Sequence, residues 1–165
     1  MDLFLIRHAA AGEGGLYCAD GERPLTAEGR RSALAVGASL AQLGVKLERI
    51  AVSPLVRAVE TAELVAVSLE YDGELEIWPE LAPEGAPEAV IARLHARPGR
   101  TALVGHLPSI GNLLGTLLCR PSGVSMSKMS VVRLGWPETR DGHPAKLVWV
   151  MTPKHLQPVA SLDAL

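Results

Sequence analysis

The fold of this chain is constrained most strongly by a pattern that occurs three times: a short aliphatic segment followed by a helical pattern. The segments are Asp2–Ile6, Arg49–Val52 and Thr101–Val104, and their length and residue types are typical of buried strands. After each of them, apolar residues recur at helical spacing: Ala33, Val36, Gly37, Leu40 and Leu43, then Leu55, Ala58, Ala62, Val65 and Leu69, then Ile110, Leu113, Leu114 and Leu117. Repetition of strand and helix predicts a parallel sheet with helices on its faces.

The later part of the chain predicts an antiparallel extension of that sheet. Ser130–Trp136 and Lys146–Met151 alternate apolar and polar residues around the turn-prone pair Asp141-Gly142, as in a hairpin. A further helix is expected from about Pro87 to just before Pro98. The predicted fold class is therefore α/β: a three-layer sandwich with a mostly parallel central sheet, helices on both faces and a C-terminal antiparallel extension.

Length and composition limit the domain count and the class of protein. The 165 residues contain no internal repeat and no linker, so we expect one domain over residues 1–165, with a loosely packed tail from about residue 153. A formal net charge of -2 argues against a general nucleic-acid or membrane-surface binder. No apolar run approaches the ~20 residues that cross a bilayer. The first residues turn charged at Arg7, unlike a signal peptide.

The cysteines and histidines carry further expectations. Cys18 and Cys119 are too few for a disulfide framework, which favours a reducing compartment and a cytoplasmic location. No pair of His or Cys residues has the spacing of zinc ligands, so we expect no metal and no cofactor. Three histidines lie in segments with no other chemical signal and are expected on the surface: His95, His143 and His155.

Four residues with one kind of chemistry stand where the three predicted strands end. In an open parallel α/β sheet, ligands bind beyond the carboxyl ends of the strands. The first strand runs into Arg7 and His8, and the third into His106. The second feeds a helix with Arg57 in its first turn, and helical side chains lean back toward the N-terminus. We therefore expect two histidines and two arginines at one edge of the sheet.

This set of residues suits phosphoryl transfer through a histidine. Arginine presents a planar fork of donors that matches phosphate oxygens. A neutral imidazole is a competent nucleophile toward phosphorus, and a second histidine can stabilise the charge that develops on the transferred group. Each residue alone has a simpler explanation, such as a structural histidine or a solvated arginine. Those explanations would have to hold for all four residues at one edge, which makes them jointly improbable.

The residues at this edge resemble the motifs of the histidine phosphatase superfamily, whose fold is shared with the phosphoglycerate mutases. Arg7-His8-Ala9 resembles the first motif, Ser53–Thr61 the second and Val104-Gly105-His106 the third. The resemblance spans roughly Met1 to Gln157 and is closest to the short SixA-type phosphohistidine phosphatases. Four further segments carry that closer likeness: Arg23-Pro24-Leu25-Thr26, Pro79–Pro83, His106-Leu107-Pro108 and Met151-Thr152-Pro153.

The resemblance implies roles for individual residues. His8 becomes the phosphorylated nucleophile, and Arg7, Arg57 and His106 bind the phosphoryl group. Arg23 becomes an additional phosphate ligand that reaches in from the long loop after the first strand. The family's usual glycine after the nucleophile is Ala9 here, which costs about 1 kcal/mol if the position needs a positive φ and almost nothing otherwise.

The sequence is compatible with three functions. The favoured one is a metal-independent phosphatase that hydrolyses phosphohistidine on a histidine-containing phosphotransfer or phosphocarrier protein in signal transduction, through phospho-His8. An imidazole leaving group needs little acid catalysis, whereas an alkoxide needs a strong general acid. Glu80 is the best candidate for such an acid, but it fits a surface carboxylate equally well. The alternatives are a small-molecule phosphomonoesterase and a non-catalytic phosphoprotein-binding module. A chain this short leaves few residues for a lid, which suits a protein-borne substrate.

Overall fold

Six strands form one sheet in the computed structural model of the chain, which describes residues 1–13, 19–120, 122–137 and 144–155. The order across the sheet is β3-β2-β4-β1-β5-β6. The strands are β1 (Asp2–Arg7), β2 (Arg49–Val52), β3 (Leu75–Ile77), β4 (Thr101–Gly105), β5 (Val131–Gly135) and β6 (Lys146–Met151). The first four in chain order pair in parallel, whereas β5 runs antiparallel to β1 and to β6. The predicted mostly parallel sheet with an antiparallel extension is confirmed.

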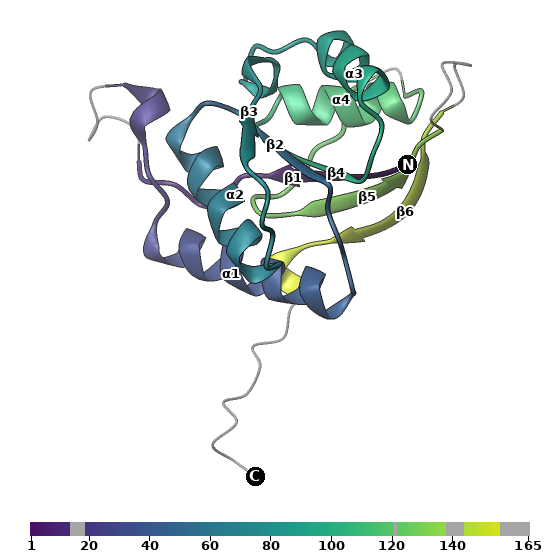
Figure 1. Cartoon of the computed structure of the whole chain (residues 1–165). Helices are drawn as coiled ribbons and strands as arrows, with labels where there is room; N and C mark the ends of the chain where they lie inside the picture. The colour runs from purple at the N-terminus through teal and green to yellow at the C-terminus, as the bar shows by residue number, and fades with distance from the viewer. Residues whose placement is uncertain (14–18, 121, 138–143, 156–165) are drawn as a thin grey trace.

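Two helices cover each face of the sheet (Figure 1). The helices α1 (Ala27–Gln42) and α2 (Val56–Ser68) pack on one face, and α3 (Pro87–Ala96) and α4 (Ser109–Leu117) on the other. Alternate residues of β1 enter the two cores: Phe4 and Ile6 face α1 and α2, and Leu3 and Leu5 face α3 and α4. All four side chains are almost fully buried. This confirms the predicted three-layer arrangement.

The ends of α1 follow local capping chemistry. Thr26 is the N-cap, and its Oγ1 accepts a hydrogen bond from the backbone N–H of Gly29 at 3.0 Å. At the other end, Gly44 adopts a φ of 69°, and its N–H donates to the carbonyl of Ala41 at 2.9 Å. A left-handed conformation of this kind suits glycine and stops the helix.

Among the described residues there are three single-turn helices: η1 (Asp20–Glu22) and η2 (Pro79–Leu81) in connections, and η3 (Pro153–His155) after the last strand. The first belongs to the long loop between β1 and α1 and lies beyond the sheet end opposite the N-terminus (Figure 1). The third follows β6 directly. The turn of the predicted hairpin at Asp141-Gly142, together with Cys18, lies outside the described residues.

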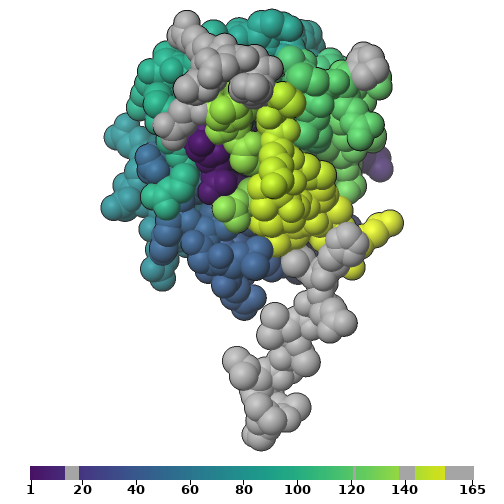
Figure 2. All heavy atoms as spheres, turned by 90° about the vertical axis from the view of Figure 1, so that its right-hand side faces the viewer, coloured from purple at the N-terminus to yellow at the C-terminus, as the bar shows by residue number. Residues whose placement is uncertain are grey.

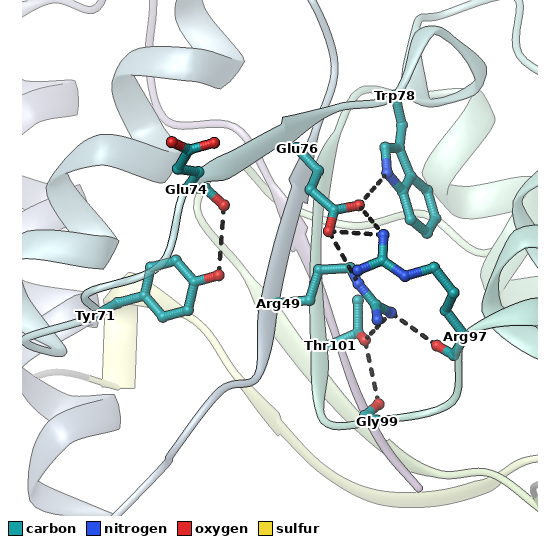
Figure 3. Close-up of polar contacts among 8 residues, drawn as sticks. All are labelled: Arg49, Tyr71, Glu74, Glu76, Trp78, Arg97, Gly99 and Thr101. Carbon is teal, nitrogen blue, oxygen red and sulfur yellow. Dashed lines mark hydrogen bonds and ion pairs between the residues drawn. The ribbon is translucent and has the colours of Figure 1, made fainter.

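A polar network links the strands at the end of the sheet where β2 and β4 begin (Figure 3). Arg49, the buried first residue of β2, donates to the carbonyl of Arg97 at 2.8 Å and to Thr101 Oγ1 at 3.2 Å. Glu76 of β3 lies 3.3 Å from Arg49 Nε and also accepts from Trp78 Nε1 at 3.1 Å. The network joins β3, β2 and β4 at the edge opposite to the histidines, so its role is structural.

The edge strand β6 is the most exposed of the six (Figure 2). Leu147, Val148 and Val150 leave about half of their surface in solvent. On the opposite face of the same strand, Trp149 packs against Phe4 with ring centroids 6.0 Å apart. Within the described ranges, no helix combines the length and the apolar character that crossing a membrane requires.

Candidate active site

Neighbouring strands bring His8 and His106 together at the carboxyl edge of the sheet. His8 follows the last residue of β1 and His106 the last residue of β4, and these two strands pair in parallel. The backbone N–H of His8 donates to the carbonyl of Gly105 at 3.0 Å, which extends the ladder to the histidine itself. The two imidazole rings lie with centroids 4.8 Å apart. The predicted convergence of the two histidines is confirmed.

One hydrogen bond fixes the tautomer of His8. Its Nδ1 lies 2.7 Å from the carbonyl oxygen of Ala9, and a carbonyl oxygen only accepts, so Nδ1 carries the proton. Nε2 is left with its lone pair and has no hydrogen-bond partner among the described residues. Burial lowers the pKa of His8 from 6.5 to about 4. The positive charges of Arg57 and Arg7 lower it as well, so His8 is neutral and nucleophilic near pH 7.

The position after His8 needs no glycine. Ala9 is not among the residues with positive φ, so the alanine avoids the cost that a left-handed position would impose. Its backbone N–H donates to Thr61 Oγ1 at 3.1 Å, and Thr61 Oγ1 in turn donates to the carbonyl of Arg57 at 2.6 Å. A fully buried threonine of α2 thus joins the segment after His8 to the helix that carries Arg57.

The second histidine is held by a serine and keeps one donor site free. His106 Nε2 lies 2.8 Å from the hydroxyl of Ser53, the residue that follows β2. The hydroxyl can donate to Nε2, which then leaves the proton on Nδ1. Nδ1 is buried and has no hydrogen-bond partner among the described residues. Burial, together with the charges of His8 and Arg57, lowers the pKa of His106 to about 3, although the charge of Asp20 acts in the opposite direction.

Two arginines act on the two imidazoles, and the charges of both lower the pKa of His8. Arg57, the second residue of α2, is 4% exposed although it carries a charge. Arg7 donates to the carbonyl of Met126 at 2.6 Å, in the segment that leads into β5. Arg23 donates to the carbonyl of Gly12 at 2.9 Å, within the loop between β1 and α1, and is linked to Arg57 through Asp20. The role of Arg23 as a phosphate ligand stays a prediction.

Four nitrogens of this cluster are buried without hydrogen-bond partners among the described residues. They are the Nε–H donors of Arg7, Arg23 and Arg57, and His106 Nδ1, which is a fourth donor when Ser53 donates to Nε2. Native proteins leave few buried donors unpaired, so four in one cluster require an explanation. Two further atoms of this kind lie elsewhere: Arg49 Nε, which has Glu76 at 3.3 Å, and His95 Nδ1. The cluster around His8 is a preformed set of donors for an oxyanion.

An acidic residue that the sequence analysis missed connects two of these arginines. Asp20 Oδ1 lies 2.7 Å from Arg23 Nη2, and Asp20 Oδ2 lies 3.0 Å from Arg57 Nη2. Its carbonyl also accepts from Arg57 Nη1 at 2.7 Å. The three-residue spacing between Asp20 and Arg23 was the available signal in the sequence. A second missed residue is Lys128, whose charge lowers the pKa of His8.

Glu80 does not join this cluster through any contact that the described residues make. Its carboxylate lies 3.2 Å from Arg93 Nη1 of α3, and Arg93 lies over the ring of Trp78, 4.8 Å from its centroid. The interpretation of Glu80 as a general acid stays a prediction. In the part of the chain that the structure describes, no three His, Cys, Asp or Glu side chains are grouped as metal ligands would be.

A separate cavity of about 570 Å³ lies next to the cluster. It lies between α4, the segment 122–130 and the strands β5 and β6, and neither histidine lines it. It shares Met126 with the cluster, since the carbonyl of that residue holds Arg7. The buried donors and the imidazoles, and not the cavity, therefore mark the candidate site.

Comparisons with known proteins point to one family. The sequence model of the histidine phosphatase superfamily (branch 1) matches residues 3–84. The phosphohistidine phosphatase SixA of Escherichia coli K12 is 30% identical over 162 residues, covering 95% of this chain and 97% of that protein. The SixA homolog of Haemophilus influenzae is 31% identical over 159 residues, covering 90% of this chain and 93% of that protein.

A solved structure agrees with these sequence relatives. The structure of the protein histidine phosphatase SixA complexed with tungstate superposes with a TM-score of 0.87. It is 28% identical to this chain and covers 95% of it and 100% of the solved chain. The likeness thus extends over almost all of both molecules and includes the antiparallel extension as well as the parallel core.

Proposed function

The chain belongs to the histidine phosphatase superfamily and is a phosphatase of the SixA type, and from this premise we propose that it hydrolyses phosphohistidine on a partner protein through phospho-His8, without a metal ion. The observation that carries the proposal is the fixed tautomer of His8 beside four buried donors that have no partner among the described residues. The first feature supplies a nucleophile at neutral pH, and the second supplies the site for the group that it attacks.

In the proposed first step, His8 Nε2 attacks phosphorus in line with the leaving nitrogen. A bond forms between Nε2 and phosphorus while the bond between phosphorus and the substrate imidazole breaks, and its electron pair stays on the departing nitrogen. The oxygens of the transferred group would accept hydrogen bonds from the unpartnered Nε–H groups of Arg7, Arg57 and Arg23 and from His106 Nδ1. The hydrogen bond from His8 Nδ1 to Ala9 stabilises the imidazolium that develops on His8.

In the second step, water attacks the phosphorus of phospho-His8. The bond between phosphorus and Nε2 breaks, its electron pair returns to Nε2, and inorganic phosphate leaves. Burial and the neighbouring arginines disfavour a positive charge on His8, as its pKa of about 4 indicates. The same environment therefore favours return of the imidazole to its neutral form and supports turnover. The arginines neutralise the phosphoryl oxygens, so the proposed chemistry assigns no task to a metal ion.

Two observations support phosphohistidine as the substrate class. The relatives that match this chain over nearly its full length include two phosphohistidine phosphatases of the SixA type. In addition, the carboxylate of Glu80 is engaged by Arg93, and the carboxylate of Asp20 is engaged by Arg57 and Arg23, which lower its pKa, so neither group is set up as a proton donor. An imidazole that is protonated on its second nitrogen leaves as a neutral group and needs no such acid.

We further propose that the substrate is a histidine-containing phosphotransfer or phosphocarrier protein and that the enzyme works in the cytoplasm. Two cysteines in 165 residues, of which Cys119 is an exposed free thiol, suit a reducing compartment. We also propose that residues 1–165 act as one domain, because the two cores share one sheet.

The test compares two substrates in the presence of a metal chelator. Phosphate release is measured from a phosphohistidine-bearing carrier protein and from an aryl phosphate, with excess EDTA, for the wild type, His8→Ala and Glu80→Gln. We expect fast release from the carrier that persists with EDTA, vanishes in His8→Ala and changes little in Glu80→Gln. His8-dependent turnover of the aryl phosphate alone would move the substrate class to small phosphoesters. Loss of activity with EDTA would contradict metal independence.

A further inference from the structure

Asp20 makes three contacts to the arginines of the site, although its side chain is 64% exposed. One carboxylate oxygen is 2.7 Å from Arg23, the other is 3.0 Å from Arg57, and the backbone carbonyl accepts from Arg57 at 2.7 Å. An exposed carboxylate seldom holds two guanidinium groups at once, since surface ion pairs lose entropy and are screened. Here one partner, Arg57, is buried, which fixes the geometry.

These contacts determine which edge of each arginine remains free. Asp20 takes one N–H from each terminal nitrogen of Arg57, through its carbonyl and its carboxylate. In Arg23, Gly12 takes Nη1 and Asp20 takes Nη2. In both arginines the Nε–H is left over, buried and without a partner among the described residues. The terminal nitrogens of the two guanidinium groups are thus engaged by Asp20 and Gly12, and the Nε–H groups are left for an oxyanion.

The charge of Asp20 also lets the arginines share a small volume. Arg57 and Arg23 both attract the carboxylate and lower the pKa of Asp20, so it is ionised at neutral pH. Without that negative charge, two guanidinium groups that meet at one side chain would repel each other. The same carboxylate raises the pKa of His106, which places Asp20 within the electrostatic field of the site.

We propose that Asp20 is a positioning residue of the phosphoryl-binding site, which holds Arg57 and Arg23 in the arrangement that binds an oxyanion. The inference rests on the proposed function only in that the cluster binds a phosphoryl group. It adds a role for the loop between β1 and α1: η1 carries the residue that organises arginines from two separate elements. Asp20 itself touches the arginines and takes no part in the bonds that form or break.

Asp20→Asn tests the proposal, with Glu22→Gln as the matched control. Glu22 is another carboxylate of η1, but its oxygen accepts from the backbone N–H of Ala19 instead of an arginine. Binding of inorganic phosphate is measured by calorimetry, alongside kcat and KM for an aryl phosphate. We expect Asp20→Asn to weaken phosphate binding about tenfold, because one misaligned arginine loses a charge-assisted hydrogen bond. Glu22→Gln should bind like the wild type, and Asp20→Glu should recover part of the affinity.

The outcomes separate this role from others. Phosphate bound equally or more tightly by Asp20→Asn would overturn the proposal, because the carboxylate would then compete with phosphate for the arginines. An equal loss in Asp20→Asn and Asp20→Glu, together with a lower Tm for both, would reduce the role to general stability and also overturn it. Since phosphate binding is measured without a phosphoprotein, failure of the phosphohistidine assay would leave this result interpretable.

Discussion

Gly29 of α1 lets the helix approach the backbone of Ala10 closely, which holds the segment after His8 in place. Replacing Gly29 tests this contact. A Cβ at this position would fall on the carbonyl oxygen of Ala10 and lie 3.0 Å from its carbon. That carbonyl accepts two hydrogen bonds from the N-cap Thr26, one from its N–H at 2.9 Å and one from its hydroxyl at 3.3 Å. The carbonyl of the preceding residue, Ala9, orients the imidazole of His8.

Opposing effects determine how Gly29→Ala changes the free energy of unfolding. Helix propensity alone would stabilise the variant by about 1 kcal/mol. The clash involves backbone atoms, and overpacking of this kind costs about 1–3 kcal/mol. Displacement of Ala10 also weakens its bonds to the N-cap, which costs about 1 kcal/mol more. The net expectation is a loss of about 2 kcal/mol, which lowers Tm by about 4–8 °C in a chain of this size.

The assay combines thermal unfolding with kinetics. We expect kcat/KM of Gly29→Ala to fall about tenfold below Tm, because movement of Ala10 carries the carbonyl of Ala9 and misplaces His8. Gly135→Ala is the matched control: its Cβ would meet Val148 at an ordinary 3.9 Å, so stability should hold or rise slightly. If Gly29→Ala were as stable and active as Gly135→Ala, the close approach would not support the nucleophile loop.

Three further predictions concern other parts of the molecule. Thr61→Val should lose about 1–3 kcal/mol in denaturant unfolding, because the buried N–H of Ala9 loses its acceptor, whereas Thr61→Ser should lose less; equal losses would contradict this. Because burial lowers the folded pKa of His8 from 6.5 to about 4, the unfolded chain binds more protons between these values, so stability should fall as pH falls through this range. His8→Asn should reduce that slope in urea titrations and leave the part that His106 contributes, and an unchanged slope would count against the prediction. Arg49→Met should lower the free energy of unfolding by about 1–3 kcal/mol without loss of activity below Tm. Arg97→Met, at a side chain that is 63% exposed, should lower it by less than about 1 kcal/mol.

The position of His8 and His106 could be predicted from the sequence because it follows from topology. Parallel neighbours end at the same edge, so His8 after β1 and His106 after β4 had to meet once both segments were recognised as strands. Arg57 followed because side chains in the first turn of a helix point back toward that edge. No measured distance was needed for these three residues.

Other features depend on tertiary structure that no local pattern contains. The contact between Asp20 and Arg57 is set by the path of a loop without periodicity, and the sequence shows only that both residues exist. The pairing of Glu80 with Arg93 depends on how α3 lies over η2. The prediction of a surface position was wrong for His95, which is half-buried with its ring 4.3 Å from that of Trp136; His143 and the side chain of His155 lie outside the described part.

The central claim is that His8 carries the phosphoryl group, and direct detection of phospho-His8 tests it best. The enzyme is mixed with a phosphohistidine-bearing carrier, quenched within milliseconds in alkali and digested, and the peptide with His8 is examined by mass spectrometry. The account predicts one phosphoryl group on His8 that appears before free phosphate and decays with turnover. Release of phosphate with no phosphoryl group on His8 at any quench time, while the carrier is consumed at the full rate, would contradict it.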